Sequence, residues 1–455
     1  MSPDRGCRIS RWYLIRRGTV ATSLVASAWL AHATGAQPTM QRRTAFVDVD
    51  VLTMDTDQLL RRQTVVVTGG VITALGPAAR IAPPRGARIV DGRGKYLMPG
   101  LADLHVHLVG DRATQLALLK AFVANGVTTT LNVRGTLDHL ALRSDVGSWA
   151  VLGPTIYTAG PYVNEPYVTT PDEVERAVVE QKRAGYDFVK MHGNLSRDAY
   201  ARLNAVGKRE RIPIIGHSPR NLGFEAMFEQ RQYAVLHAEE FIYDRSGSSR
   251  DFAQLEPRIP EIARAAATAG LWVMPNLTAF RNIALQINDL EAMLARPEMA
   301  LLPASIRDGW GAATNPYTRR FGKDMYPAIM ARYALLEKLT RGFRDAGTRL
   351  LVGTDALNTG TVPGTSAHDE LALLVRAGLT PYEALRAATA NAGEFLQRAD
   401  LGTVAVGKQA DLLLLDANPL NDIANTRRIA GVMVRGRWLG RPNIRGMAEE
   451  LKRAQ

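Results

Sequence analysis

The chain has 455 residues, of which 46% are hydrophobic and 22% are charged, with 39 glycines and 23 prolines. These values are typical of a globular protein with a large buried core, and they exclude a disordered or fibrous chain. The formal net charge of +12 comes from lysines and arginines that are scattered along the sequence, so we expect a solvated basic surface and no nucleic-acid partner.

The first 36 residues have the order of a secretory signal peptide. A basic start that ends at Arg16 and Arg17 precedes the uncharged run 18–30, which is short for a membrane-spanning helix. Small residues then offer cleavage sites, and we expect the cut near Ala36. The protein is therefore predicted to be exported, periplasmic or secreted, without a stable membrane anchor after cleavage. An uncleaved anchor is the alternative, and the twin arginine leaves the export route open between Sec and Tat.

The only cysteine, Cys7, lies in this leader. The mature chain therefore has no disulfide and no thiolate ligand. Any metal ion must be held by histidine, by carboxylate or by a modified lysine.

Both ends of the remaining chain contain short runs of alternating apolar and β-branched residues, which predict strands. These runs cover residues 44–52, 64–68, 71–75, 411–415 and 429–434. The chain between these two ends has a different pattern of apolar and polar residues. We therefore expect one small β-sandwich domain that residues 37–97 and 398–455 form together.

Between the two ends, short apolar runs alternate with helix-like segments. Strands are predicted at residues 127–133, 155–159, 188–191, 213–216, 233–237, 271–275 and 349–353. Helices are predicted at residues 196–211, 221–232, 259–269 and 381–390. This alternation indicates an α/β fold, a (β/α)8 TIM barrel over residues 98–397. The stretch 276–341 is too long for one strand–helix connection, so we expect a helical insertion that covers the site.

His105 and His107 lie in the first apolar run of the barrel region. Positions two apart share one face of a strand, so both imidazoles can reach the barrel mouth and bind one metal ion. The pattern alone is weak, because two histidines in an apolar strand also occur as packing residues.

Three further polar residues each end a predicted strand: His217, His237 and Asp355. Barrel enzymes carry their chemistry at the carboxyl ends of the strands. A carboxylate after four barrel residues would otherwise be a costly buried charge. Together with the first two histidines, these residues predict a metal centre.

Lys190 ends the run Asp187–Lys190 and is the remaining member of the set. An ammonium group that points at two cations would be repelled, so the position requires a neutralised side chain. Carbamylation by CO₂ would convert the lysine into a bridging carboxylate. A strand-end lysine that pairs with an acidic neighbour is the alternative.

The run Met98–His107, MPGLADLHVH, resembles the first-strand motif of the amidohydrolase superfamily. The positions that this family uses on strands four, five, six and eight match, in order, Lys190, His217, His237 and Asp355. The run Leu401–Leu415, LGTVAVGKQADLLLL, is similar to the family's return into its β-sandwich. The resemblance covers about residues 44–440 and omits no ligand position.

The resemblance implies two divalent metal ions. Zinc is the default for a histidine-rich site, with manganese, cobalt or iron as alternatives. The implied ligands of the more buried ion are His105, His107 and Asp355, and those of the outer ion are His217 and His237. Carbamylated Lys190 and a hydroxide would bridge the two ions.

The implied catalytic residues are Lys190, His237 and Asp355. Two cations lower the pKa of the water that attacks, and the outer ion, held by His237, polarises the scissile carbonyl. Asp355 would accept the proton of this water and return it to the leaving nitrogen.

Residues that follow the strands are weaker candidates for substrate contacts: Arg134, Tyr162, His192, Tyr243 and Asn276. Of these, Arg134 suits a substrate carboxylate because guanidinium binds carboxylates in a bidentate manner. A surface arginine without a ligand is the commoner outcome.

The expected activity is hydrolysis of an amide or peptide-type C–N bond of a small substrate, as in the dipeptidase-like and imidazolonepropionase-like branches that the chain resembles. Lys190 favours these over the deaminase branches, whose sites usually hold one metal ion. Phosphotriester or lactone hydrolysis on the same centre is an alternative, because fold does not choose between them. A non-catalytic binding protein is a third alternative, against which the intact ligand set argues. The expected partner is a small molecule, and a homo-oligomer is compatible with the sequence.

Overall fold

The computed structural model describes residues 42–243 and 251–453. The predicted leader, its cleavage site and Cys7 lie outside the described residues. Within the described ranges, no helix combines the length and the apolar character that crossing a membrane requires.

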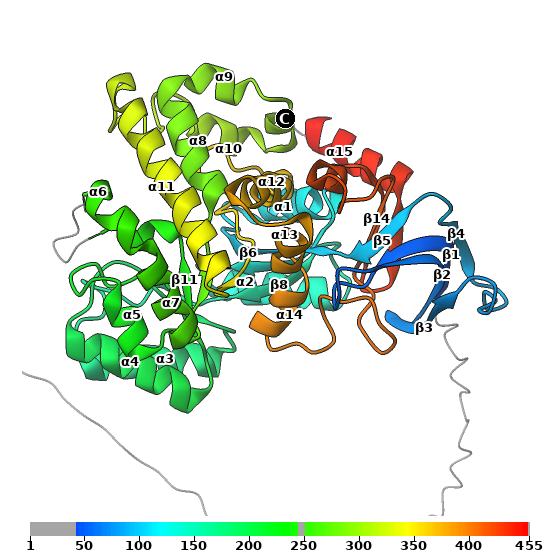
Figure 1. Ribbon diagram of the computed structural model, residues 1–455, viewed down its shortest axis with the longest axis horizontal. Helices are drawn as coiled ribbons and strands as arrows, with labels where there is room; N and C mark the ends of the chain where they lie inside the picture. Colours follow the sequence, from blue (N-terminus) through cyan, green and yellow to red (C-terminus); the bar gives the residue numbers. More distant parts are fainter. Residues whose placement is uncertain (1–41, 244–250, 454–455) are drawn as a thin grey trace, which may run out of the picture. The chain divides into compact units, whose positions relative to one another are not determined.

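Strands from both ends of the described chain join in one eight-stranded sheet (Figure 1). Its strands are β1 (Arg43–Leu52), β2 (Leu59–Thr68), β3 (Val71–Pro77), β4 (Arg88–Asp91), β5 (Tyr96–Pro99), β14 (Leu412–Leu415), β15 (Ile429–Val434) and β16 (Arg437–Gly440). The two chain ends meet where β14 runs antiparallel to β5, with Leu412 opposite Pro99. Apolar side chains of both ends, such as Phe46 and Leu414, share one buried cluster. The predicted joining of the two ends in one sheet is therefore confirmed, and a sandwich of two facing layers stays a prediction.

Eight parallel strands follow in two further sheets. The first contains β6 (Leu101–Val106), β7 (Val127–Asn132) and β8 (Thr155–Thr158). The second contains β9 (Val189–Met191), β10 (Ile214–Gly216), β11 (Ala234–Leu236), β12 (Trp272–Met274) and β13 (Arg349–Leu350). Parallel bridges between Ala159 and Phe188 and between Val106 and Ala356 join the two sheets at both edges. Each strand predicted in this region is present.

Helices separate the parallel strands, as the alternation predicts. They are α1 (Arg112–Ala124), α2 (Leu137–Gly147), α3 (Pro171–Ala184), α4 (Arg197–Glu210), α5 (Glu225–Gln230), α6 (Phe252–Leu255) and α7 (Ile259–Ala269). After β13 come α12 (Thr365–Ala377), α13 (Pro381–Ala387) and α14 (Ala390–Phe395), and α15 (Arg441–Arg453) ends the described chain. Thr380 caps α13, because its hydroxyl accepts a hydrogen bond from the Glu383 amide.

One predicted helix is shorter than the sequence suggests. The segment 221–232 contains only α5, because the residues before it form turns in which the Leu222 and Gly223 amides donate to the Pro219 carbonyl. Gly223 has a φ of 80°, which a right-handed helix cannot accommodate.

The segment between β12 and β13 is helical, as expected for the insertion. It contains α8 (Leu277–Asn288), α9 (Leu290–Leu294), α10 (Ala304–Gly309) and the long α11 (Tyr326–Asp345). α11 packs against α7 and α8 (Figure 1). The start of α8 is fixed by the buried Glu370 carboxylate, which accepts from the amides of Leu277 and Thr278.

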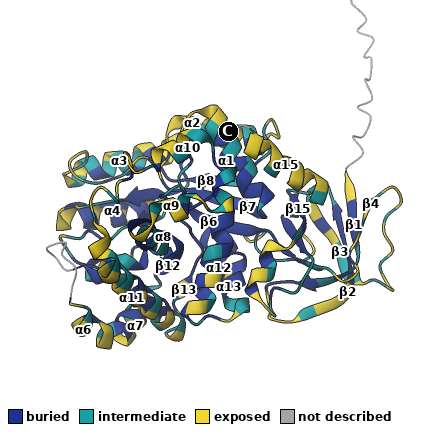
Figure 2. Ribbon diagram, turned by 90° about the horizontal axis from the view of Figure 1, so that it is seen from above, coloured by how far each residue is buried: buried dark blue, intermediate teal, exposed yellow. Residues whose placement is uncertain are grey.

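Figure 2 shows that the parallel strands are buried, whereas the surrounding helices carry the exposed residues. All six residues of β6 and all six of β7 are buried. Polar side chains among these strands therefore require partners inside the protein.

Candidate metal centre

The six predicted ligands come together at the carboxyl ends of the parallel strands. His105 lies on β6 with His107 just after it, Lys190 lies on β9, and the other three follow β10, β11 and β13. The side chains of His105 and Lys190 are almost fully buried, with relative exposures of 0% and 1%. His107, His217 and Asp355 keep some exposure, so the centre opens on one side.

Asp355 lies between the first two histidines. Its Oδ1 is 3.3 Å from His105 Nε2 and 3.1 Å from His107 Nε2. Lys190 Nζ is 3.4 Å from the same His105 nitrogen. These distances bring the predicted ligands of the more buried ion, and the predicted bridging lysine, into one cluster.

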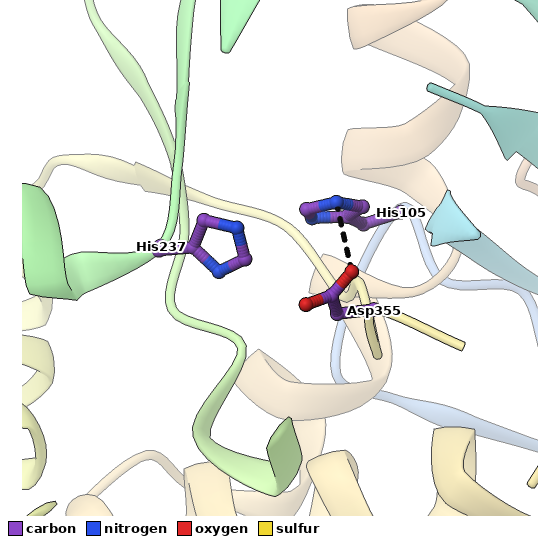
Figure 3. Close-up of side chains that lie close together, drawn as sticks. All are labelled: His105, His237 and Asp355. Atoms are coloured by element: carbon purple, nitrogen blue, oxygen red, sulfur yellow. Dashed lines mark ion pairs between the residues drawn. The ribbon is translucent and has the colours of Figure 1, made fainter. Parts of the chain in front are cut away.

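The remaining histidines continue this cluster. The ring centroid of His237 lies 4.8 Å from that of His105 and 5.1 Å from that of His217. Ligand atoms of His105, His237 and Asp355 all lie within 4.8 Å of one another. Figure 3 shows these three side chains turned toward one another from three different strand ends. His237 is an expected ligand of the outer ion, whereas His105 and Asp355 are expected ligands of the more buried ion. The two predicted ligand sets are therefore neighbours.

Close backbone approach makes this arrangement possible. Gly216 precedes His217 and has a φ of 126°, and a side chain there would lie 2.0 Å from the carbonyl oxygen of Met191. Only glycine therefore allows β10 to approach β9 at this point. His237 and Asp355 have φ values of 79° and 59°, so both ligands sit on left-handed backbone.

The donor set fits divalent metal ions. Nδ1 of His237 is buried and has no hydrogen-bond partner among the described residues, which leaves a lone pair or a proton unsatisfied. Among the described residues no salt bridge joins Lys190 to a carboxylate, although Asp355 and Glu240 lie near enough to oppose the lowering of its pKa by burial. Imidazole nitrogens and a carboxylate are ligands that Zn²⁺ and similar ions take.

Burial and mutual repulsion shape the titration of the cluster. Burial lowers the pKa of His105 well below its usual value, and the neighbouring Lys190 ammonium lowers it further. Burial also lowers the pKa of His237 to about 3. Burial alone would raise the pKa of Asp355, but the facing His105 and His107 hold this pKa well below its usual range. Neutral imidazoles and an ionised carboxylate are the protonation states that bind metal.

Glu240 is a functional residue that the sequence pattern does not single out. Its carboxylate is fully buried and accepts from His217 Nδ1 at 2.9 Å and from Arg220 Nη2 at 3.0 Å. The amide and hydroxyl of Ser218 donate to its other oxygen. Burial alone would raise the pKa of Glu240, but His217 and Arg220 lower it below its usual value. Bonding at Nδ1 leaves Nε2 of His217 free for a metal ion.

Two other buried polar residues hold ligand-bearing segments in place. Asp103 accepts from the Thr354 amide at 2.9 Å and from its hydroxyl at 2.6 Å, which ties β6 to the residue before Asp355. Asn276 Oδ1 accepts from the His237 amide at 3.1 Å. Asn276 was expected to contact substrate, but it is fully buried beneath the histidines, so a direct contact stays a prediction.

Three of the predicted substrate residues form a stack beside the centre. The rings of Tyr162 and His192 are parallel with centroids 4.6 Å apart, and His192 lies 4.4 Å from His217. The Arg134 guanidinium lies 5.0 Å from the Tyr162 ring. Arg134 is exposed and has no ion-pair partner among the residues described.

Tyr243, the last predicted substrate residue, belongs to a separate charged group. Its hydroxyl donates to Glu239, which also pairs with Arg332 of α11 at 3.1 Å. The Arg220 guanidinium stacks on the Tyr243 ring at 3.9 Å and reaches Glu240. This group joins the insertion helix to the partner of His217.

Solved structures of known proteins share this fold. A bottromycin amidohydrolase structure superposes with a TM-score of 0.70 at 25% identity, covering 91% of this chain and 90% of that one. The structure of a Xaa-Pro dipeptidase with bound methionine superposes with a TM-score of 0.69 at 19% identity, covering 88% of this chain and 100% of that one, a likeness of fold alone.

The sequence relatives lead to the same group. Imidazolonepropionase from Deinococcus radiodurans is 28% identical over 395 residues, 79% of this chain and 87% of the relative. Adenine deaminase 2 from Agrobacterium fabrum is 24% identical over 392 residues, 81% of this chain and 52% of the relative. The model of the amidohydrolase family matches residues 96–439. Since this match spans most of the sequence, the chain belongs to the amidohydrolase family, whose members hydrolyse C–N bonds with divalent metals.

Proposed function

We propose that this chain is a binuclear metal hydrolase that cleaves an amide or peptide-type C–N bond of a small substrate. The observation that carries the proposal is the position of Lys190. It is buried against His105 at the junction of the four histidines, without a carboxylate partner in the described chain. A structural lysine at 1% exposure would need such a partner.

The fold that we infer around this centre is a closed (β/α)8 barrel with a sandwich from both chain ends beside it. The bridges at Ala159–Phe188 and Val106–Ala356 support closure, because they link both edges of the two parallel sheets. A closed barrel gathers all strand ends at one mouth, where the six ligands lie.

Carbamylation is the modification that we propose for Lys190. Burial lowers its pKa to about 8, which increases the fraction of neutral amine, the form that reacts with CO₂. The reaction forms one C–N bond, releases one proton and leaves a carbamate with two oxygen donors. That carbamate would hold both ions, with His105, His107 and Asp355 on one and His217 and His237 on the other. Zinc is the proposed metal because the ligands are mostly imidazoles.

Asp355 is the proposed proton carrier. When bound, the two ions lower the pKa of a water molecule and polarise the scissile carbonyl. Asp355 accepts the proton that this water loses and delivers it to the leaving nitrogen. Its Oδ2 accepts from Asn358 Nδ2 at 3.3 Å, and this hydrogen bond orients the carboxylate.

The substrate that we propose carries a carboxylate near the scissile bond. Arg134 is an exposed cation at the end of the stack that Tyr162 and His192 form toward His217. Arg220 and Arg332 are already neutralised by Glu240 and Glu239, so among the three described arginines beside the centre it is Arg134 that lacks a counter-charge. Binding of a carboxylate there makes the substrate dipeptide-like, in keeping with the dipeptidase-like activity that the sequence predicts.

A turnover screen with metal-loaded protein tests the proposal. We expect about two metal equivalents per chain and hydrolysis of dipeptides or N-acyl amino acids. Free-acid dipeptides should exceed their C-terminal amides in kcat/KM by about tenfold, and Arg134→Ala should remove this difference. Hydrolysis of phosphotriesters or lactones only, or deamination only, would overturn the substrate class. Absence of bound metal in active protein would overturn the mechanism.

A further inference from the structure

A cavity lies near the amino ends of two strands whose carboxyl ends precede histidines of the metal centre. It has a volume of about 330 Å³ and is lined at the amino ends of β10 and β11, between α4, α5 and the residues after α14. His217 and His237 follow the carboxyl ends of the same two strands. The cavity is therefore separate from the metal centre.

The lining is cationic. It includes Lys208, Arg211 and Arg231 and contains no carboxylate. Neither arginine has an ion-pair partner among the described residues, and Lys208 Nζ donates only to the Gln230 carbonyl, at 3.2 Å. Other arginines of α4 differ, because Arg202 and Arg209 both pair with the same acidic residue, Glu175. The cations that face the cavity are thus the ones without a counter-charge.

The backbone at the two arginines is unusual. Arg211 and Arg231 end α4 and α5 with φ values of 53° and 51°, in the left-handed region. The neighbouring helices α3 and α7 end in the same conformation with glycine, at Gly185 and Gly270. Glycine is the favoured residue there, because other side chains are strained. Arginine therefore replaces the favoured residue at the two helix ends that line the cavity.

The rest of the lining is mostly apolar, with Asn204 and Gln397 as its uncharged polar side chains. Ile212 and Ile214 are buried beneath it, and Pro213 and Tyr233 stand partly exposed beside them. The volume falls in the range of small-molecule sites. A guanidinium binds carboxylates and phosphates through paired hydrogen bonds, while an apolar ring or chain packs against tyrosine and proline.

We propose that this cavity binds a small organic anion, a carboxylate or phosphate monoester with a compact apolar body. Arg211 and Arg231 hold the anionic group, and Tyr233 and Pro213 contact the body. The site is independent of the proposed hydrolysis, because none of its residues touches the metal ligands' side chains at the other strand ends.

Calorimetric titration of metal-loaded protein with benzoate and with phenyl phosphate tests the site, with uncharged benzamide as the control ligand. We expect one equivalent of anion to bind and benzamide not to bind, and the tighter of the two anions identifies the headgroup. The double variant Arg211→Gly, Arg231→Gly should bind at least tenfold more weakly. Its Tm should be equal or higher, because glycine suits both backbone positions.

Two further variants control for net charge and for binding at the metal centre. Arg202→Gln with Arg209→Gln removes the same net charge from the same side and should leave anion binding within twofold. Lys190→Ala disables the metal centre and should also leave it unchanged. Loss of binding in Lys190→Ala with retention in the double glycine variant would assign the anion to the metal centre and overturn the proposal. Unchanged binding with a lowered Tm in the double glycine variant would make the arginines structural and would also overturn it.

Discussion

Replacing Glu240 with glutamine should weaken the metal centre without touching a ligand. In the native protein, Oε1 accepts from His217 and Arg220, and Oε2 accepts from the amide and hydroxyl of Ser218. A glutamine of the same shape has one acceptor oxygen and one NH₂ group. If the glutamine oxygen faces His217, its NH₂ group faces the backbone N–H of Ser218. These two groups are both donors, and neither then has an acceptor.

The expected magnitude follows from this arrangement. A buried group left without its partner costs about 1–3 kcal/mol. Loss of the negative charge also weakens the hydrogen bond that orients His217, and mutation of such supporting partners typically lowers metal affinity about 10- to 100-fold. That range corresponds to about 1.4–2.8 kcal/mol of binding free energy. We therefore expect Glu240→Gln to fold, with a lower Tm and a metal affinity reduced by one to two orders of magnitude.

Competition with a chelator, followed by metal analysis, measures this affinity. The adjacent carboxylate offers a matched control, because Glu239 pairs with Arg332 and Tyr243 but does not contact His217. Glu239→Gln should keep the metal affinity, because it leaves the hydrogen bond between Glu240 and His217 in place. If Glu240→Gln retains native affinity while Glu239→Gln loses it, the support assigned to Glu240 is wrong.

Four other outcomes are expected. Lys190→Ala should lose metal and activity, a short carboxylic acid should restore part of both, and full activity without the lysine would contradict a bridging role. Asp355→Asn should stay folded while kcat falls by about 10²-fold or more, and an unaltered rate and pH–rate profile would remove it from proton transfer. His368 lies on α12, buried between the Thr426 hydroxyl and the Asn125 carbonyl. Burial lowers its pKa to about 3 in the folded protein, so the protein loses stability as the pH falls from about 6.5 toward 3, by up to about 1.4 kcal/mol per pH unit. Denaturant unfolding across this range should show a shallower loss in His368→Gln, and identical slopes would refute this. We propose export, so the intact mass of protein from its native compartment should lack residues 1–36, and a retained leader on cytoplasmic protein would contradict it.

The strands were predictable because their signal is local. The parallel strands are short, largely apolar runs, and five of the eight carry or precede a proposed ligand of a residue type that an apolar core does not tolerate without a reason. Helix ends were less predictable. In the segment 221–232, helix-forming residues are present, but contacts of Pro219 and the left-handed Gly223 decide where α5 begins.

The partners of the ligands could not be predicted in the same way. Glu239 and Glu240 are adjacent acidic residues, and such a pair normally indicates a solvated turn. Their different roles appear only when the short helix after His237 brings one carboxylate to His217 and the other to Tyr243. Glu240 lies three residues after His237, and this spacing is the signal that the sequence contains. Without the fold, it does not show which of the two carboxylates contacts a ligand. Asn276 is recognisable as a strand-end residue, yet only the structure shows that it faces the buried side of the histidines.

Three of the eleven non-glycine residues with positive φ in the described chain lie at the carboxyl ends of neighbouring barrel strands. Three successive strands, β11, β12 and β13, are followed by His237, Asn276 and Asp355, which have φ values of 79°, 54° and 59°. A non-glycine residue in this region costs about 1–2 kcal/mol. Glycine at any of these three positions would relieve the strain. It would also remove a proposed ligand, or the Asn276 side chain that accepts a hydrogen bond from the His237 backbone amide. These three positive-φ positions are therefore residues that the proposed chemistry needs. Hydrogen bonds such as that from Asn276 Nδ2 to the Gly353 carbonyl, at 2.7 Å, hold these turns in place.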